Sequence, residues 1–486
     1  MDHRSLWQKT VSAPARASVL EDDIHCDAVI VGAGLTGILT AWMLQEQGFD
    51  VVILDSGVPG QGATAHTTAK ITALHGFYYS KLISSYGIET AKLYLQANQH
   101  AIARYAELIQ THDFACDFQK VNGFLYSRSP SHKIEEEFSA LKSLAASPCF
   151  TTKTQLPFSV SAALSLNDQA IFHPLKFINS LLSCLRIYQN STVKKISNQA
   201  VICDQAVVTA KHIVVATRYP FFLYPGFFFA RMHQERSYAL SITDIAAMDD
   251  MYIDINHKGV TFRPWCGQII LSGFSHRTGH KPSQNGYDAL HHCAQHWYPG
   301  YNSTAQWSAE DSISSDQIPY IGSYEYSGSK IHVATGFCKW GMSTAMIAAE
   351  VISDSICGNK NRFARLFSPH RSPDAKTIAA MLHDGAISIG NLTKEVLYYP
   401  RTKLHQIPPG QGEIIQFSGK KAGVYHHPNG TLYFVSTKCP HMGCQLSWNP
   451  AECTWDCPCH GSRFSYDGTP LDPPAKSALP CTVRKV

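Results

Sequence analysis

The chain has 486 residues, of which 44% are hydrophobic and 16% are charged. This ordinary globular composition excludes a disordered chain, a collagen and a coiled coil. The formal charge of +4 is small and no stripe of lysine or arginine follows the chain, so we expect no nucleic-acid partner. Prolines and a glycine interrupt the most apolar stretch, residues 219–230, so we expect no membrane span.

The N-terminal arm, residues 1–26, carries several charged side chains and lacks the apolar core of a secretory signal, so the expected location is cytoplasmic. Hydrophobic periodicity then predicts, in chain order, a strand at 27–31, a helix after a glycine loop, a strand at 51–54, a helix at 86–110, mixed strands between 115 and 300, and a strand, turn and helix at 331–357. Residues 359–384 are the predicted linker. Residues 385–486 alternate short strands with proline and glycine turns, which is typical of a small β domain.

The glycine loop has the pattern of a dinucleotide site. In Gly32-Ala-Gly-Leu-Thr-Gly37 the first glycine permits a tight turn, the second lets backbone approach a pyrophosphate, and the third lets helix and strand pack closely. An acidic residue ends the next strand, where it can accept hydrogen bonds from ribose hydroxyls. The predicted contacts are Gly32, Gly34, Leu35, Thr36, Gly37 and Asp55. The alternative is a ligand-free glycine turn, and the spacing does not separate FAD from NAD.

Residues 27–357 resemble the FAD-dependent oxidoreductase family that includes D-amino acid oxidase and glycine oxidase. Besides the glycine loop, the segments that carry the resemblance are residues 60–70, 214–217, 316–322 and 334–344. The resemblance implies an α/β FAD-binding Rossmann-type domain interleaved with an α+β substrate domain, together covering residues 27–358. It also implies FAD contacts from Thr64, Thr67, Thr68, Thr217, Gly336, Phe337, Gly341, Met342 and Thr344.

The sequence departs from the amino-acid oxidases at the place where these usually carry an arginine that holds the substrate carboxylate. The corresponding stretch, residues 310–315, has no arginine, and serine cannot form a bidentate clamp. The catalytic residues therefore stay unassigned, with His173, Tyr238 and Arg263 as weak candidates. The alternatives are a structural histidine, a core tyrosine and an arginine in an ordinary ion pair.

Six of the fifteen cysteines lie in the last fifty residues, and four of these form two tight clusters. Each cluster pairs a cysteine with a histidine, as Cys439-Pro-His441 and as Cys457-Pro-Cys-His460. Two thiolates and two imidazoles could hold zinc. They also suit two irons, one bound by both thiolates and the other by both imidazoles.

The two boxes resemble those of the Rieske [2Fe-2S] ferredoxin domain, over residues 385–486. The resemblance implies that Cys439, His441, Cys457 and His460 ligate the cluster, and that Cys444 and Cys459 form a disulfide. Ser462 matches a serine that donates to a bridging sulfide in high-potential members, whereas Phe464 replaces their tyrosine and so lacks one donor. We therefore expect a potential in the middle of the Rieske range, which is roughly −150 to +300 mV.

The order of the two domains is similar to that of bacterial FAD oxidoreductases that end in a Rieske domain. We expect an enzyme that oxidises an amine-type substrate at FAD and passes single electrons through the cluster, with His441 and His460 as an exposed exit. The expected partners are a small-molecule electron donor and an external electron acceptor or reductase. The alternative is a redox sensor or electron carrier without its own substrate. Substrate, direction of flow and oligomeric state stay open.

Overall fold

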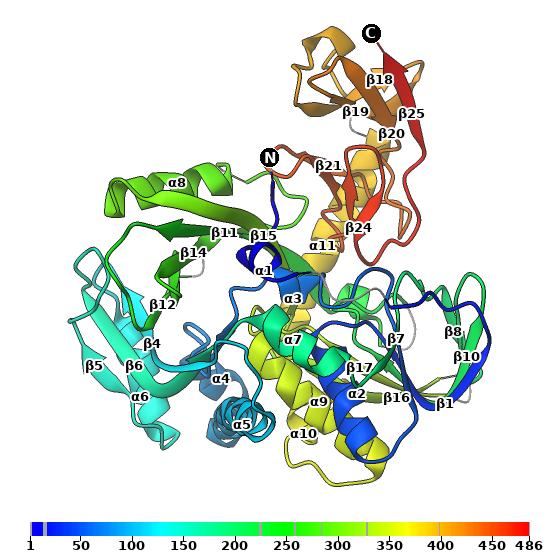
Figure 1. The fold of residues 1–486 in the computed structure, drawn as a ribbon. Helices are drawn as coiled ribbons and strands as arrows, with labels where there is room; N and C mark the ends of the chain where they lie inside the picture. Colours follow the sequence, from blue (N-terminus) through cyan, green and yellow to red (C-terminus); the bar gives the residue numbers. More distant parts are fainter. Residues whose placement is uncertain are drawn as a thin grey trace.

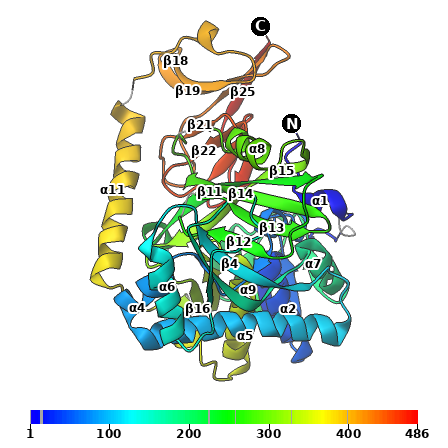
Figure 2. The same cartoon turned by 90° about the vertical axis from the view of Figure 1, so that its left-hand side faces the viewer.

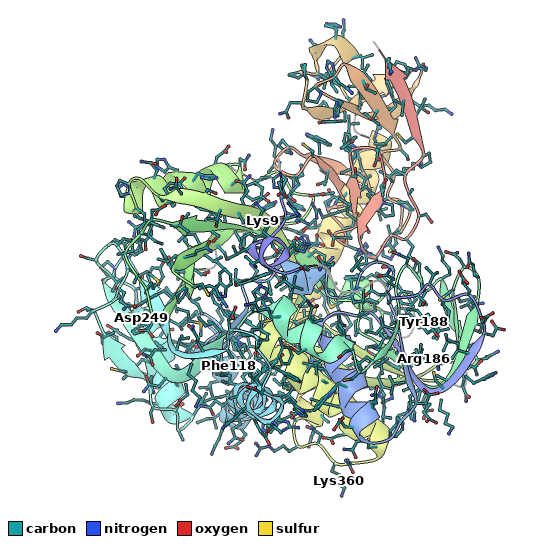
Figure 3. All side chains as sticks on the ribbon, viewed as in Figure 1. Lys9, Phe118, Arg186, Tyr188, Asp249 and Lys360 are labelled. Atoms are coloured by element: carbon teal, nitrogen blue, oxygen red, sulfur yellow. A yellow bond between two sulfur atoms is a disulfide. The ribbon has the colours of Figure 1, made fainter. Side chains whose placement is uncertain are left out.

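The computed structural model describes residues 2–12, 17–222, 226–256, 259–282, 284–326, 329–397 and 399–485. Within these residues the chain builds a body around two large sheets, with a smaller C-terminal domain of two four-stranded sheets above it (Figure 1). Lys360 lies at the end of the molecule opposite the C-terminal domain (Figure 3).

The first sheet carries the glycine loop near its centre. Its strands run in the order β16 (Tyr320–Tyr326), β17 (Ser329–Thr335), β10 (Val207–Val215), β1 (Ile24–Val31), β2 (Val51–Leu54) and β7 (Arg186–Tyr188), and β9 (Ala200–Ile202) joins β10 to β8 (Lys195–Ser197). β1 pairs in parallel with β10 and β2. The second half of β1 and all of β2 are buried, which explains their unbroken apolar sequences. The predicted Rossmann-type arrangement is confirmed.

Helices cover the first sheet. α2 (Leu35–Glu46) and α9 (Gly341–Cys357) pack against each other, and α9 also packs against α5 (Ile88–His112). The start of the helix expected at 86–110 is wrong. Tyr86 is the last residue of α4 (Tyr79–Tyr86), Gly87 separates the two helices, and α5 begins after it. Gly87 has a φ of +82°, which a side chain would disfavour. The short helices are α1 (Leu6–Thr10), α3 (Ala63–His66), α7 (Pro174–Leu182) and α10 (Ala364–Phe367).

The second sheet is mixed and comes from segments that alternate with those of the first. Its order is β15 (Asn302–Ser314), β11 (Met232–Thr243), β14 (Gln268–Arg277), β13 (Thr261–Trp265), β12 (Met251–Asp254), β4 (Gln119–Ser127), β6 (Ala162–Ile171) and β3 (Lys70–Ile71), with β5 (Cys149–Thr151) beside β6. α8 (Gly286–Trp297) packs on β11 and β14, and α6 (His132–Ser143) packs on β4 and β6. This is the interleaved α+β domain that the sequence predicted.

A long helix connects the body to the C-terminal domain. α11 (Ala375–Leu397) runs along one side of the molecule from the body to the C-terminal sheets (Figure 2), so it spans the end of the predicted linker. One C-terminal sheet has the order β18 (Gly412–Phe417), β19 (Lys420–His426), β20 (Thr431–Val435) and β25 (Cys481–Lys485). The other has the order β21 (Ser447–Asn449), β22 (Thr454–Asp456), β23 (Arg463–Ser465) and β24 (Pro470–Asp472).

No helix in the described part of the chain combines the length and the apolar sequence needed to cross a bilayer.

Candidate functional site: a dinucleotide cavity beside a cysteine–histidine centre

The glycine loop is shaped by close backbone contacts. Gly32 has a φ of +109°, and a Cβ there would lie 2.7 Å from the carbonyl oxygen of Ala216. A Cβ on Gly37 would lie 1.9 Å from the carbonyl oxygen of Gly32, so only glycine lets α2 pack against this turn. Asp55 accepts hydrogen bonds from the backbone N–H groups of Ala33 (2.6 Å) and Gly57 (2.8 Å). Its carboxylate keeps free lone pairs for ribose hydroxyls.

A cavity of about 970 Å³ begins at this loop and extends toward the second sheet. Most of the predicted FAD contacts line it, namely Gly32, Gly34, Leu35, Thr36, Asp55, Thr64, Thr67, Thr68, Thr217, Phe337, Gly341 and Met342. Gly37, Gly336 and Thr344 do not line it. Gly336 has a φ of +70° and shapes the turn before α9, whose first residues face the cavity. The size, the exposed backbone and the acid at the end of β2 fit an extended dinucleotide such as FAD.

The three weak catalytic candidates lie outside this cavity. His173 caps α7 by accepting from the Lys176 N–H, and its Nε2 lies 3.0 Å from Thr10 Oγ1. Tyr238 is buried between the rings of His276 and Tyr287. Arg263 is fully buried, stacks on Trp7 and donates to the carbonyl of Phe172. Their positions suit structural roles.

Sequence reasoning missed several polar groups that line the cavity. Lys70 is buried and donates to Thr68 Oγ1 (3.1 Å) and Thr261 Oγ1 (2.8 Å). Burial, together with the charge of Arg263, lowers the pKa of Lys70 to about 7. Lys70 belongs to the segment 60–70 that carries the family resemblance, but only the folded chain shows that it lines the cavity and that, among the described residues, no carboxylate pairs with its ammonium group. The other missed groups are His233, Glu235 and Lys339.

The cysteine–histidine boxes come together at one tip of the C-terminal domain. The rings of His441 and His460 have centroids 4.9 Å apart. Cys439 and Cys457 are buried, and a hydrogen bond from the Cys457 thiol lowers the pKa of Cys439 to about 7. The Nδ1 atoms of both histidines are buried and have no hydrogen-bond partner in the described structure. Two adjacent thiols and two unsatisfied imidazole nitrogens fit the ligand set of a [2Fe-2S] centre with mixed ligation.

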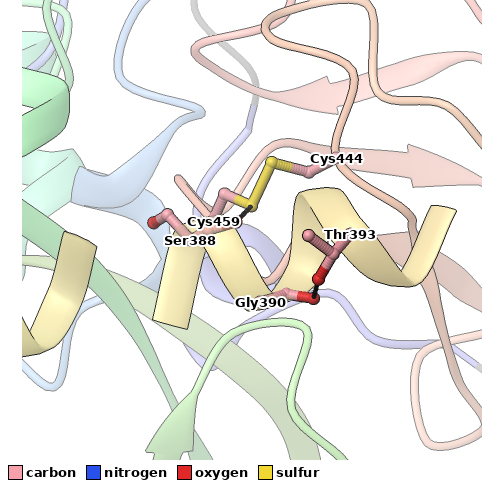
Figure 4. The surroundings of a disulfide bond; sticks show 5 residues. All are labelled: Ser388, Gly390, Thr393, Cys444 and Cys459. Carbon is pink, nitrogen blue, oxygen red and sulfur yellow. Dashed lines mark hydrogen bonds between the residues drawn. A yellow bond between two sulfur atoms is a disulfide. The ribbon is translucent and has the colours of Figure 1, made fainter. Parts of the chain in front are cut away.

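Cys444 and Cys459 form a disulfide, with their Cα atoms 6.6 Å apart. It ties the two boxes together beside α11, where Cys459 Sγ lies 3.8 Å from the carbonyl oxygen of Ser388 (Figure 4). The Cys457 sulfur lies within 4.8 Å of both disulfide sulfurs, so the bond borders the metal site.

The expected exposure of both histidines is wrong for His460. Its side chain is only 4% exposed, because it faces the body, with the ring of Phe229 at 6.1 Å. His441 is half-buried. The sequence could not show this, because exposure depends on how the C-terminal domain packs on the body. One ligand thus faces the flavin domain and the other is closer to solvent.

Residues 470–476 of the C-terminal domain line the same cavity as the predicted FAD contacts. A set of ion pairs holds them there. Asp472 bonds Arg218 of the body at 2.7 Å and Arg463 of its own domain at 2.7 Å. Arg218 also bonds Glu310 at 2.9 Å. At the end of the segment, Lys476 donates to the carbonyl of Val193.

Comparison with known proteins agrees with both sites. Residues 27–355 match the family described as "FAD dependent oxidoreductase". The chain belongs to this family. Residues 398–483 match the Rieske [2Fe-2S] domain, so this FAD dependent oxidoreductase ends in an iron–sulfur domain and binds both FAD and a [2Fe-2S] cluster.

Several relatives share one or both parts. The Bacillus subtilis (strain 168) protein YhfW, whose name describes a Rieske 2Fe-2S iron–sulfur protein, is 33% identical over 97% of this chain and 96% of its own length. The cytochrome b6-f complex iron–sulfur subunit of Chlorobaculum tepidum is 40% identical over 14% of this chain and 37% of its own length. The crystal structure of glycine oxidase from Geobacillus kaustophilus covers 72% of this chain and 100% of its own, with 16% identity and a TM-score of 0.62. This last likeness shows the fold alone.

Proposed function

We propose that this FAD dependent oxidoreductase takes two electrons from an amine-type C–N substrate and delivers them one at a time to its own Rieske centre. The observation that carries the proposal is the shared cavity, because residues 470–476 of the iron–sulfur domain line it together with the glycine loop and the turn before α9. Bound FAD supplies hydride acceptance, and the cluster supplies one-electron transfer. The protein holds substrate, flavin and cluster in a fixed spatial order.

The residues of this chain have separate tasks in that arrangement. Asp55 and the glycine loop would hold the nucleotide half of FAD, and the N–H groups at the N-terminus of α2 would be available to its phosphates. Arg218 and Asp472 fasten the iron–sulfur domain to the body. His460 turns the ligand side of the cluster toward the body, and the less buried His441 leaves a side for an external acceptor.

The polar lining of the cavity supports an enzyme over a simple electron carrier. Lys70, Glu235, Ser237 and Ser275 reach it from the second sheet, which supplies the substrate side of the fold. A carrier needs an open flavin edge rather than an interior chamber lined by side chains that can orient a small molecule.

Anaerobic reduction of the holoprotein with a panel of amines and amino acids tests the proposal. We expect a member of the panel to bleach flavin absorbance, followed by the rhombic EPR signal of the reduced cluster. A Cys457→Ser variant, which removes a cluster ligand, should keep the flavin bleaching and lose the EPR signal. If no amine bleaches either centre while a reductase reduces both, the carrier alternative replaces the enzyme.

A further inference from the structure

If the proposed function holds, oxidation of the amine releases protons in the flavin cavity. Oxidation of R–CH2–NH3+ to R–CH=NH2+ breaks one C–H and one N–H bond and sets free two electrons and two protons. Electrons that pass to the cluster leave these protons behind in the flavin cavity, whereas an acceptor such as O2 that reacts there would take up protons as well. The protons therefore have to leave the cavity separately from the electrons.

A row of acid and base side chains leads from the cavity to the surface. Lys339 Nζ, beside the flavin-facing turn, lies 2.8 Å from Glu235 Oε2. Glu235 Oε1 lies 3.6 Å from His233 Nε2, and His233 Nδ1 lies 3.1 Å from Asp384 Oδ2. Asp384 Oδ1 lies 3.8 Å from Nδ1 of His383, whose side chain is 75% exposed.

Three separate segments supply this row. Glu235 and His233 are alternate residues of β11, so both side chains leave the same face of the strand and line the cavity. Asp384 lies on α11, about 150 residues later in the chain, and bonds His233 on the side away from Glu235. The contacts of 3.6 and 3.8 Å are long for direct hydrogen bonds, and a small side-chain rotation brings either pair of atoms within bonding distance.

The charges around His233 suit a group that gains and loses a proton. Burial lowers the pKa of His233, but the hydrogen bond to Asp384 and the nearby carboxylate of Glu235 outweigh burial and raise it above its usual value. Burial raises the pKa of Asp384, but His233 and Arg277 bring it to about 2, so Asp384 stays an acceptor at neutral pH. The other charged neighbours are Arg277, which bonds Asp384, Lys339, which bonds Glu235, and Asp311, which lies opposite Glu235 on β15.

We propose that Glu235, His233 and Asp384 form the proton exit of the flavin cavity, which ends at His383 and bulk water. His233 accepts a proton at Nε2 from the side of Glu235 and releases the proton on Nδ1 toward Asp384, which passes it to His383. Each transfer breaks one N–H or O–H bond and forms another, and the imidazole returns to its first tautomer between protons. Lys339 positions the carboxylate of Glu235 at the cavity end.

A purely mechanical role is the competing explanation. Asp384 also bonds Arg277 at the end of β14, so the same contacts could serve only to fasten α11 to the body. The two roles predict different results, because Arg277 touches Asp384 but is not a member of the row.

The test starts from full-length holoprotein reduced with dithionite and freed of excess reductant. Stopped-flow mixing with ferricyanide, which takes electrons only, is followed by flavin absorbance and by a pH-indicator dye. No amine is involved, so the test stands even if the amine reading of the proposed function fails. We expect His233→Ala and Asp384→Asn to slow dye-reported proton release at least tenfold, and free imidazole to restore it in His233→Ala. Glu235→Gln should behave like Asp384→Asn.

Arg277→Gln is the matched control, since it removes the ion pair to Asp384 and leaves the row intact. We expect it to slow proton release far less than Asp384→Asn does, because the carboxylate of Asp384 stays in place beside His233. Unchanged release in His233→Ala overturns the proposal. Equal slowing in Arg277→Gln and Asp384→Asn, without rescue of His233→Ala by imidazole, also overturns it in favour of a fastening role. If His233→Ala does not fold, the solvent deuterium isotope effect on proton release is measured in His233→Gln instead. Loss of the relay should raise this isotope effect. A purely structural role of His233 should leave it unchanged, which would overturn the proposal.

Discussion

Phe464 has no hydroxyl group and therefore cannot donate a hydrogen bond to a ligand sulfur of the iron–sulfur site. Its side chain is fully buried in one cluster with Cys439 and Cys457, and carries no donor. Phe464→Tyr should raise the reduction potential, because an O–H donor to a ligand sulfur stabilises the reduced, more negative cluster. A charged hydrogen bond of about 1.5 kcal/mol corresponds to roughly 60 mV for one electron. Redox titration followed by EPR measures the shift.

The control for this substitution is Phe417→Tyr, which adds the same hydroxyl in the other small sheet. Phe417 packs in a separate hydrophobic cluster that contains none of the ligand cysteines. Its potential should equal that of the wild type. A lower or unchanged potential in Phe464→Tyr would contradict the assignment of the missing donor.

Lys70 should make the stability of the folded protein depend on pH. Its folded pKa of about 7 lies below the value of about 10.4 in an unfolded chain. Between these two values the unfolded state binds more protons, so this residue makes stability rise with pH, by at most about 1.4 kcal/mol per pH unit. Lys70→Met should remove this contribution. Denaturant unfolding at pH values from 7 to 10 measures it, and Lys92→Met on an exposed face of α5 is the control.

A matching slope in Lys70→Met and wild type would show that Lys70 is not desolvated as the structure indicates. Sequence reasoning did not find this residue, although it ends a segment that carries the family resemblance. Burial decides its chemistry, and one of its hydrogen-bond acceptors, Thr261 of β13, follows about 190 residues later.

At the scale of elements, the two ends of β14 differ in what they touch. Gly267 before the strand and Gly279 after it have nearly equal φ values of +75° and +76°. A Cβ on Gly279 would lie 2.3 Å from the backbone nitrogen of Pro458 in the cluster loop, whereas a Cβ on Gly267 would meet nothing within 4 Å. The end of β14 is therefore a docking point for the iron–sulfur domain.

Gly279→Ala and Gly267→Ala form a matched pair. Each should cost about 1–2 kcal/mol through its positive φ. Only Gly279→Ala should displace the iron–sulfur domain, because backbone atoms cannot move aside cheaply. We expect it to slow electron transfer from reduced flavin to the cluster at least tenfold in stopped-flow experiments, and to increase the radius of gyration in solution scattering. Equal transfer rates in the two variants would show that this contact does not set the docking.

At the scale of the whole molecule, a buried charge network joins the two domains. Arg218 of the body donates a hydrogen bond to Asp472 of the iron–sulfur domain, and Arg463 of the same domain donates another. Burial raises the pKa of Asp472, but the two guanidinium groups outweigh burial and hold it well below its usual value. Such a pair stabilises only while both partners are charged, and loss of one partner costs about 3–5 kcal/mol.

Asp472→Asn should therefore loosen the docked domain. Since the folded pKa of Asp472 is lowered, its stabilisation is present above the unfolded value of about 3.9 and is lost as pH falls further. We expect limited proteolysis to cleave near α11 faster in Asp472→Asn at pH 7, and in the wild type only in acid. Glu413→Gln, on the exposed side of β18, is the control. Wild-type protection in Asp472→Asn would contradict the role of the network.

The dinucleotide loop and the cysteine–histidine boxes could both be predicted from the order of the amino acids. In both, the chemistry depends on residues close together in the chain. Gly32 and Gly37 work through the backbone of one turn, and the boxes place cysteine and histidine within four residues of each other. Spacing alone can therefore reveal such sites.

How the two centres meet became visible only in the folded chain. The burial of His460, the entry of residues 470–476 into the flavin cavity and the row from Glu235 to Asp384 all join segments that lie more than a hundred residues apart. The positions of His173 and Tyr238 outside the cavity were hidden for the same reason, since their packing partners come from distant segments. Burial and charge pairing are properties of the packed chain, and no local spacing contains them.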